Sequence, residues 1–199
     1  GVESIWTVEH ILVAEEYEPR YPYSADGLMP GGGGAVMPDP LQVLAHIGAH
    51  TSRLRLGTSV VVATQHPAAV LAKTVATLDA LTNGRVELGV GIGWQVEEYR
   101  AVNVPYEGRG ARLDDTIGAL RSLWGPDPAS FTSETVSFDR VRSAPKPAQP
   151  DGIPIVIGGS SPAAARRAGR LGDGWFPYVV SPDEVAAGDV VILAPQGFL

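Results

Sequence analysis

One histidine follows a strand-like run of residues, in a position where its side chain could do chemistry. His10 comes directly after Glu9 and the strand-like run over 2–8. In parallel α/β folds the carboxyl ends of strands carry the reactive groups. An imidazole there could move a proton or stabilise charge, because its unperturbed pKa is near ~6.5. The alternative is a strand-end histidine hydrogen-bonded to a loop, and we take His10 as the candidate catalytic residue.

A second polar interruption lies inside the apolar strand expected over 53–62. Thr58 and Ser59 follow Gly57 there and precede Val60. Hydroxyl groups in a buried strand must find hydrogen-bond partners. The backbone can supply those partners, or a bound ligand can, and the residue types leave both possibilities open.

Two glycine-rich stretches follow the next strands. Over 89–93 the sequence is GVGIG, and Trp94 stands where a dinucleotide-binding fingerprint would continue toward its third glycine. Gly91 and Gly93 would let a flat ring approach the backbone, and the alternative is a tight turn between strand and helix.

The second stretch, GGSS over 158–161, precedes Pro162 and a predicted helix. Free N–H groups at a helix N-terminus bind anions, so Gly158, Gly159 and Ser160 are candidates for holding a phosphate. The alternative is a well-capped helix, and no lysine completes a P-loop.

Composition excludes several kinds of partner and site. The chain has 199 residues, with 15 Lys+Arg against 22 Asp+Glu, a formal charge of −7, which does not favour nucleic acid. No apolar run reaches the ~18 residues of a membrane helix, so we expect a cytoplasmic protein. Cysteine is absent. His46 and His50 are four residues apart, but Ile47 replaces the glutamate of a zinc motif, and no metal is expected.

Strand-like and helix-like segments alternate along the chain, which predicts a parallel sheet and an α/β fold. Strands are expected over 2–8, 53–62, 85–90, 153–157 and 175–179. Helices are expected to begin at Pro40, Pro67 and Pro162, to cover 95–101 and 110–124, and to begin again near Ser181. The long stretch 11–38 suggests a functional loop or lid, and 125–151 a short hairpin.

Taken together, these stretches resemble the bacterial luciferase-like monooxygenase family, most of all its branch that uses the deazaflavin coenzyme F420. The resemblance covers about residues 1–185. It is carried by SIWTVEH over 4–10, RYPYSADG over 20–27, RLRLGT over 53–58, LAKTVATLD over 71–79, GRVELGVGIGW over 84–94, EGRGAR over 107–112 and the stretch 153–174.

The resemblance implies a (β/α)₈ TIM barrel with a flavin-like ring at the carboxyl ends of its strands. It implies a single domain over 1–199, incomplete because the first βα unit and the C-terminal end are missing, with an insertion over 125–151. A barrel open on one side exposes sheet edges, so we expect this chain to aggregate or to need a partner. The family is often dimeric, which leaves room for a homodimer.

The resemblance also assigns roles to the candidate residues. His10 would lie beside the ring, and Thr58, Ser59 and Val60 behind it, with a cis peptide between Ser59 and Val60. The strand edge beside the ring would be lined by Gly91, Gly93 and Trp94, and the cofactor phosphate would be held by Gly158, Gly159 and Ser160.

The implied reaction is hydride transfer between F420 and a small organic substrate. Sugar-phosphate dehydrogenases of this family carry a glutamate where this chain has Trp94, so sugar-phosphate oxidation is not expected. A monooxygenase using reduced FMN, and a truncated, non-catalytic flavin-binding protein, are the alternatives.

Overall fold

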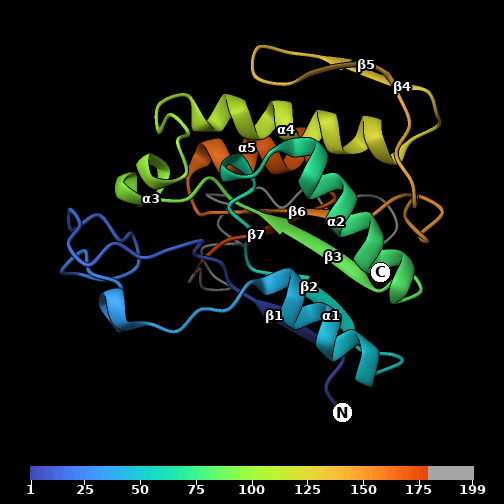
Figure 1. Cartoon of the computed structure of the whole chain (residues 1–199). Coiled ribbons are helices and arrows are strands. Elements are labelled where there is room, and N and C mark those ends of the chain that lie inside the picture. The colour runs from blue at the N-terminus through green and yellow to red at the C-terminus, as the bar shows by residue number, and fades with distance from the viewer. Residues whose placement is uncertain (179–199) are drawn as a thin grey trace.

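The computed structural model describes residues 1–178, and its centre is a parallel sheet. Five strands lie in the order β1-β2-β3-β6-β7, and all four pairings are parallel (Figure 1). Their bounds are β1 Ser4–Thr7, β2 Arg55–Thr58, β3 Val86–Val90, β6 Ile155–Gly158 and β7 Gly174–Phe176. The alternation read from the sequence therefore gives the predicted α/β fold.

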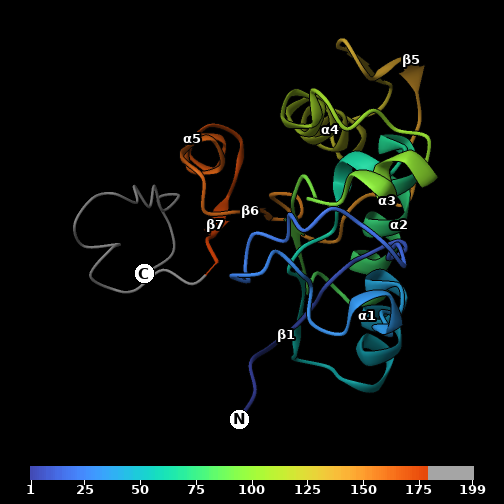
Figure 2. The ribbon, with the colours of Figure 1, turned by 90° about the vertical axis from the view of Figure 1, so that its left-hand side faces the viewer.

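Helices connect the strands as the proline and capping signals predict. They are α1 Pro40–His50, α2 Ala68–Leu81, α3 Val96–Ala101, α4 Arg109–Trp124 and α5 Pro162–Leu171, with 3₁₀ turns η1 Gly32–Gly34 and η2 Ala63–Gln65. Asp39 caps α1 by accepting from the Gln42 N–H at 2.8 Å, and Ser161 caps α5. Turned by 90°, the structure shows α1, α2 and α4 together on one side of the sheet, with α5 beside β7 (Figure 2).

The core lies between the sheet and these helices. Leu56, Leu88 and Ile155 of the strands are fully buried, as are Leu44 of α1 and Leu120 of α4. They belong to one continuous apolar cluster, whose removal from water is the main force that holds helices on the sheet. Because this core holds the strands and helices together, it also fixes the positions of the strand ends from which the loops begin.

The predicted strand over 53–62 is too long. It ends at Thr58, and the Ser59–Val60 peptide bond shortly after it is cis, as the family resemblance implies. Val61 then makes an isolated bridge to Val90 of β3 before η2 begins. Val60 itself lies against Gly91 and Gly158, at the ends of β3 and β6. The helix expected from Ser181 lies outside the described residues.

A hairpin occupies part of the segment predicted to be an insertion. Strands β4 Ala129–Thr132 and β5 Ser137–Val141 pair antiparallel, and β4 packs on α4. Phe131 of this hairpin lies over Gly118 of α4, where a larger residue would collide with its ring. The hairpin therefore covers the outer side of α4, far from the strand ends.

The sheet is curved, so side chains of its two outer strands meet. The rings of Trp6 on β1 and Phe176 on β7 stack with centroids 5.7 Å apart. Such a contact across an interior is what part of a barrel provides. Within the described residues no helix is both long and apolar enough to cross a membrane.

Candidate functional site

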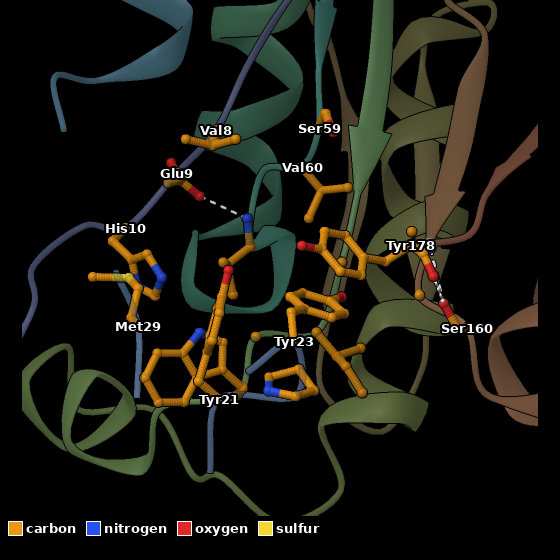
Figure 3. A pocket seen from close by; sticks show the side chains of 18 of the residues that line it. Val8, Glu9, His10, Tyr21, Tyr23, Met29, Ser59, Val60, Ser160 and Tyr178 are labelled. Atoms are coloured by element: carbon orange, nitrogen blue, oxygen red, sulfur yellow. Dashed lines mark hydrogen bonds between the residues drawn. The ribbon is translucent and has the colours of Figure 1, made fainter. Parts of the chain in front are cut away.

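A cavity of about 1250 Å³ lies at the carboxyl ends of the strands, between them and the loop over 11–38. It brings together all but one of the residues singled out from the sequence, which are His10, Ser59, Val60, Gly91, Gly93, Trp94, Gly158, Gly159 and Ser160 (Figure 3). Residues from four strand ends thus meet in one place, as a parallel sheet requires.

Thr58 is the exception. Its side chain is buried, and its hydroxyl donates to the Gly89 carbonyl at 2.7 Å. It does not line the cavity. The sequence left open whether the backbone or a ligand supplies the hydrogen-bond partner of this hydroxyl. For Thr58 the backbone supplies it, and the bond joins the end of β2 to β3.

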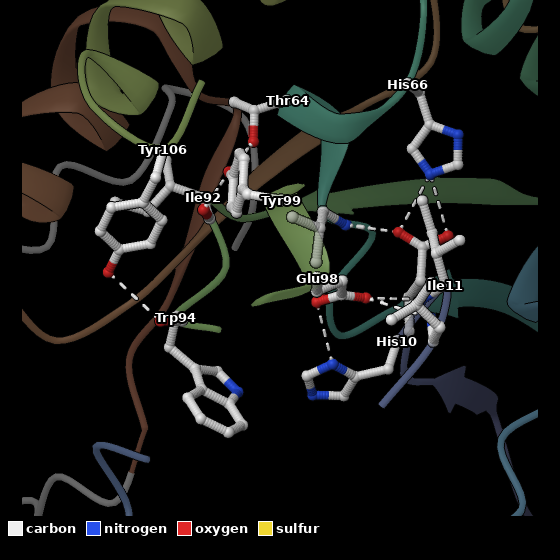
Figure 4. A network of polar contacts seen from close by, with 12 residues as sticks. His10, Ile11, Thr64, His66, Ile92, Trp94, Glu98, Tyr99 and Tyr106 are labelled. Atoms are coloured by element: carbon white, nitrogen blue, oxygen red, sulfur yellow. Dashed lines mark hydrogen bonds and ion pairs between the residues drawn. The ribbon is translucent and has the colours of Figure 1, made fainter. Parts of the chain in front are cut away.

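His10 is held by a buried carboxylate. Its Nδ1 lies 3.1 Å from Oε2 of Glu98, a residue of α3 with no exposed surface (Figure 4). The other oxygen of Glu98 accepts from the Ile11 N–H at 2.7 Å and the Leu12 N–H at 3.4 Å. A carboxylate can only accept, so Nδ1 carries the proton and Nε2 is left as an acceptor. Glu98 therefore fixes both the position and the tautomer of His10.

A second carboxylate and histidine lie beside the first pair. Glu9 is buried and accepts from the Val62 N–H at 2.6 Å and from Nε2 of His66 at 3.0 Å. Burial by itself lowers the pKa of His66, but the hydrogen bond to Glu9 and the charges of Glu9, Asp39 and Glu98 outweigh it and leave the pKa raised. This pair ties the end of β1 to the segment after β2.

Glycines form a flat floor next to Val60. A Cβ added at Gly91 would lie 2.5 Å from one methyl of Val60, and one at Gly158 would lie 2.6 Å from the other. Gly93 has a φ of 63°, and a Cβ there would approach Val62 at 2.9 Å. Val60 thus lies between Gly91 and Gly158, at the ends of β3 and β6. The backbone of both glycines lines the cavity.

The far side of the cavity is the N-terminal end of α5. Ser161 caps this helix by accepting from the Ala164 N–H. Ser160 accepts from the Tyr178 N–H at 2.8 Å and donates to its carbonyl at 3.0 Å. Both serines line the cavity, and Gly159 has a φ of 114°. The helix terminus therefore faces the cavity at a turn that only glycine adopts easily.

Arg109 is a site residue that the sequence motifs did not single out. It begins α4, lines the cavity, and stacks its guanidinium 3.7 Å from the Tyr106 ring centroid. Its Nε is buried and has no partner among the described residues. A buried, unpaired donor on a cation is suited to an anion in the cavity. It lies in the stretch EGRGAR over 107–112, which carries the family resemblance, but the sequence assigned it no role.

Glu98 left even less signal in the sequence. It lies 88 residues from His10 and next to Glu97, and nothing in a short polar helix tells which glutamate is buried. The rings of His46 and His50 meet edge-on, with centroids 4.8 Å apart. No group of three metal-binding side chains occurs in the described part of the chain.

Comparison with known families agrees with this arrangement. A family model described as luciferase-like monooxygenase matches residues 6–189. The chain belongs to this family. Family membership makes the curved five-stranded sheet part of a luciferase-like TIM barrel, and it confirms the fold and the family predicted from the sequence.

Individual relatives differ in what is known of them. An uncharacterized protein of Mycobacterium tuberculosis, Rv0940c, is 36% identical over 185 residues, covering 93% of this chain and 63% of that protein. The F420-dependent glucose-6-phosphate dehydrogenase of Nakamurella multipartita is 37% identical over 177 residues, covering 83% and 49%. The chain therefore spans less than two thirds of these relatives.

A solved structure shows the same fold. The monooxygenase RslO1 of Streptomyces bottropensis superposes with a TM-score of 0.73 at 24% identity. The superposition covers 95% of this chain and 56% of that one. At this identity the likeness concerns the fold, and it places the five strands within a larger barrel of the same kind.

Proposed function

We propose that this chain is the cofactor-binding part of an oxidoreductase that transfers hydride between F420 and a small organic substrate. One observation supports it most. A single cavity has His10, held by Glu98, at one side, glycines along its floor, and an end lined by the N-terminus of α5 and by Arg109, whose Nε has no partner among the described residues. A relative 37% identical over 177 residues is named an F420-dependent dehydrogenase.

The residues present fit a flat ring with a phosphate tail. The ring would lie over Gly91 and Gly158, where any Cβ would push Val60 aside. The phosphate would be held by the N–H groups around Ser160 and by the unpaired Nε of Arg109. A bound deazaflavin supplies hydride transfer to or from carbon.

His10 handles the proton that accompanies the hydride. In alcohol oxidation the C–H bond breaks and the hydrogen leaves with the electron pair as hydride, which a bound deazaflavin would accept. The O–H proton goes to Nε2 of His10, and a C=O double bond forms. Glu98 stabilises the charge that His10 gains, because its carboxylate already accepts from Nδ1. In the reducing direction the same proton returns to the carbonyl oxygen.

Titration of the purified chain with F420 and, separately, with FMN tests the proposal. Protein fluorescence reports binding of each cofactor. We expect F420 to bind more tightly than FMN, and Arg109→Gln to weaken F420 binding about tenfold through loss of a charge-assisted contact. Arg112→Gln is the matched control, because Arg112 is on the same helix but only donates to carbonyls of Pro105 and Glu107.

The outcomes separate the alternatives. Preference for FMN would favour a reduced-FMN monooxygenase. Binding of F420 without turnover of any alcohol or ketone would favour a non-catalytic flavin-binding protein. Binding of neither cofactor would contradict the proposal for this chain.

A further inference from the structure

A run of aromatic rings crosses the cavity from His10 to the end of β7. Trp94 meets the His10 ring edge-on with centroids 5.7 Å apart, and Tyr21 meets Trp94 at 5.3 Å. Tyr23 follows at 5.2 Å from Tyr21 and stacks on Tyr178 at 3.7 Å. Tyr21 and Tyr23 come from the loop over 11–38, so this loop covers the cavity with ring faces (Figure 3).

These rings form an uncharged surface with room left on it. Tyr23 is 39% exposed and Tyr178 is 43% exposed, so the stacked pair keeps accessible faces. Burial, followed by the neighbouring tyrosines, raises the pKa of Tyr23, and burial, followed by Tyr178, raises the pKa of Tyr21. Both phenols therefore stay neutral at physiological pH. A flat apolar group could stack on these faces.

The acidic side chains near His10 disfavour binding of an anionic substrate there. The carboxylates of Glu9 and Glu98 are both buried beside the His10 end, and their partners are histidines and backbone N–H groups. No lysine or arginine pairs with either one in the described residues. A phosphate or carboxylate placed next to His10 would lie close to the buried carboxylate of Glu98 in a poorly screened environment.

We propose that the substrate is an uncharged alcohol or ketone with an aromatic or apolar body. Its reacting carbon lies at His10, and its body lies against Trp94 and Tyr21. This proposal rests on the proposed function, because it assigns the substrate of the same cavity. Arg109 is assigned to the cofactor phosphate, and Arg20, the other arginine that lines the cavity, is already paired with Glu18, so neither is left for a sugar phosphate.

The test measures binding of two probes, 1-phenylethanol and glucose 6-phosphate, to the full chain with and without saturating F420. Ligand-observed NMR gives a dissociation constant for each. We expect 1-phenylethanol to bind at least tenfold more tightly than glucose 6-phosphate. Tighter binding of glucose 6-phosphate at the same site would overturn the proposal.

Variants locate the probe on the rings. Trp94→Ala should weaken 1-phenylethanol binding about fivefold or more, the scale of one lost aromatic contact, and Trp94→Phe should restore much of it. Leu81→Ala is the control, since this side chain is 75% exposed on α2, away from the cavity, and we expect no change. Equal binding to the wild type and to Trp94→Ala would overturn the assignment to these rings.

Failure of this proposal can be told from failure of the proposed function. If F420 binds and the sugar phosphate is preferred, only the substrate class is wrong. If F420 does not bind but 1-phenylethanol binds in a Trp94-dependent way, the aromatic site stands and the cofactor proposal is wrong.

Discussion

At the scale of single residues, the orientation of His10 depends on one carboxylate. Glu98 has no exposed surface and accepts from the His10 ring and from two backbone N–H groups. An isosteric amide could still accept from the Ile11 N–H through its oxygen. Its NH₂ group would then face Nδ1, and two donors cannot pair with each other.

We therefore predict that Glu98→Gln reverses the tautomer of His10 while the chain stays folded. Nδ1 would become the acceptor, and Nε2 would carry the proton toward the cavity. The ¹⁵N chemical shifts of the ring distinguish the two forms directly. Transfer of a proton to His10 would be lost with its acceptor, so any alcohol oxidation should fall by about a hundredfold, the scale of general base catalysis.

Glu97→Gln is the matched control for this prediction. Glu97 is the adjacent residue of α3, and its carboxylate makes only a 3.5 Å contact to the Glu18 N–H among the described residues. The His10 tautomer should not change there. An unchanged tautomer in Glu98→Gln itself would show that Glu98 does not fix the ring.

The Glu9–His66 pair predicts a pH dependence of stability. A raised pKa means that the folded chain holds the His66 proton more tightly than the unfolded chain does. The resulting stabilisation is complete below the unfolded value of 6.5 and is lost as the pH rises through the higher folded value. Its size should be roughly 1 to 2 kcal/mol, as for a hydrogen bond between charged groups.

Urea unfolding of the wild type and of His66→Gln between pH 5 and 9 measures this effect. The difference in unfolding free energy between the two should be largest at the acid end and should shrink toward the alkaline end. A difference that grows with pH would mean that burial, rather than Glu9, controls the histidine.

The site residues that could be predicted from the sequence are those that directly follow a predicted strand. His10, Gly91 and Gly158 follow apolar runs directly, and the parallel sheet brings such positions together. Glu98 and Arg109 act from helices far along the chain, where only packing decides what faces the cavity. The sequence also did not show that the Thr58 hydroxyl would donate to a carbonyl inside the sheet.

At the scale of elements, the glycine floor sets the width of the cavity. Gly91→Ala would put a Cβ 2.5 Å from a methyl of Val60, which must then move toward the cavity. We predict that F420 binding weakens tenfold or more while the melting temperature changes by only a few degrees, since the crowding is at the mouth and not in the core. Titration and thermal unfolding of the same sample check both parts.

Gly125→Ala is the control for the floor. Gly125 ends α4 with a φ of −73°, and an added Cβ would approach only two carbonyl oxygens, at 3.4 and 3.5 Å. Cofactor affinity should be unchanged in this variant. Equal binding by Gly91→Ala and the wild type would mean that the ring does not lie over this floor.

Helix starts were predictable because capping is local. Asp39 before Pro40 and Ser161 before Pro162 carry their signal in neighbouring residues, and both helices begin as predicted. The end of β2 was not predictable from its apolar pattern. Val60, Val61 and Val62 look like a buried strand, but Val60 and Val62 line the cavity, and only Val61 bridges to β3. A run of apolar residues indicates burial, but it does not distinguish a buried strand from a buried segment beside a cavity.

At the scale of the whole molecule, the two outer strands of the sheet are joined through its interior. β1 pairs only with β2, and β7 only with β6, within the described residues. Trp6 covers Gly57, where a larger residue would collide with the indole, and stacks on Phe176 from the other edge. This one contact links the start of the described chain to its end across the concave side of the sheet.

We predict that Phe176→Ala loosens both edges at once. The loss of unfolding free energy should be about 1 to 2 kcal/mol, below that of a fully buried phenylalanine, because Phe176 is 41% exposed. Amide hydrogen exchange should speed up at Ile5 and Trp6 on β1 as well as on β7. The exposed Leu81→Ala should leave both edges unchanged. Faster exchange on β7 alone would mean that the edges are independent, and that only the helices outside hold the curved sheet together.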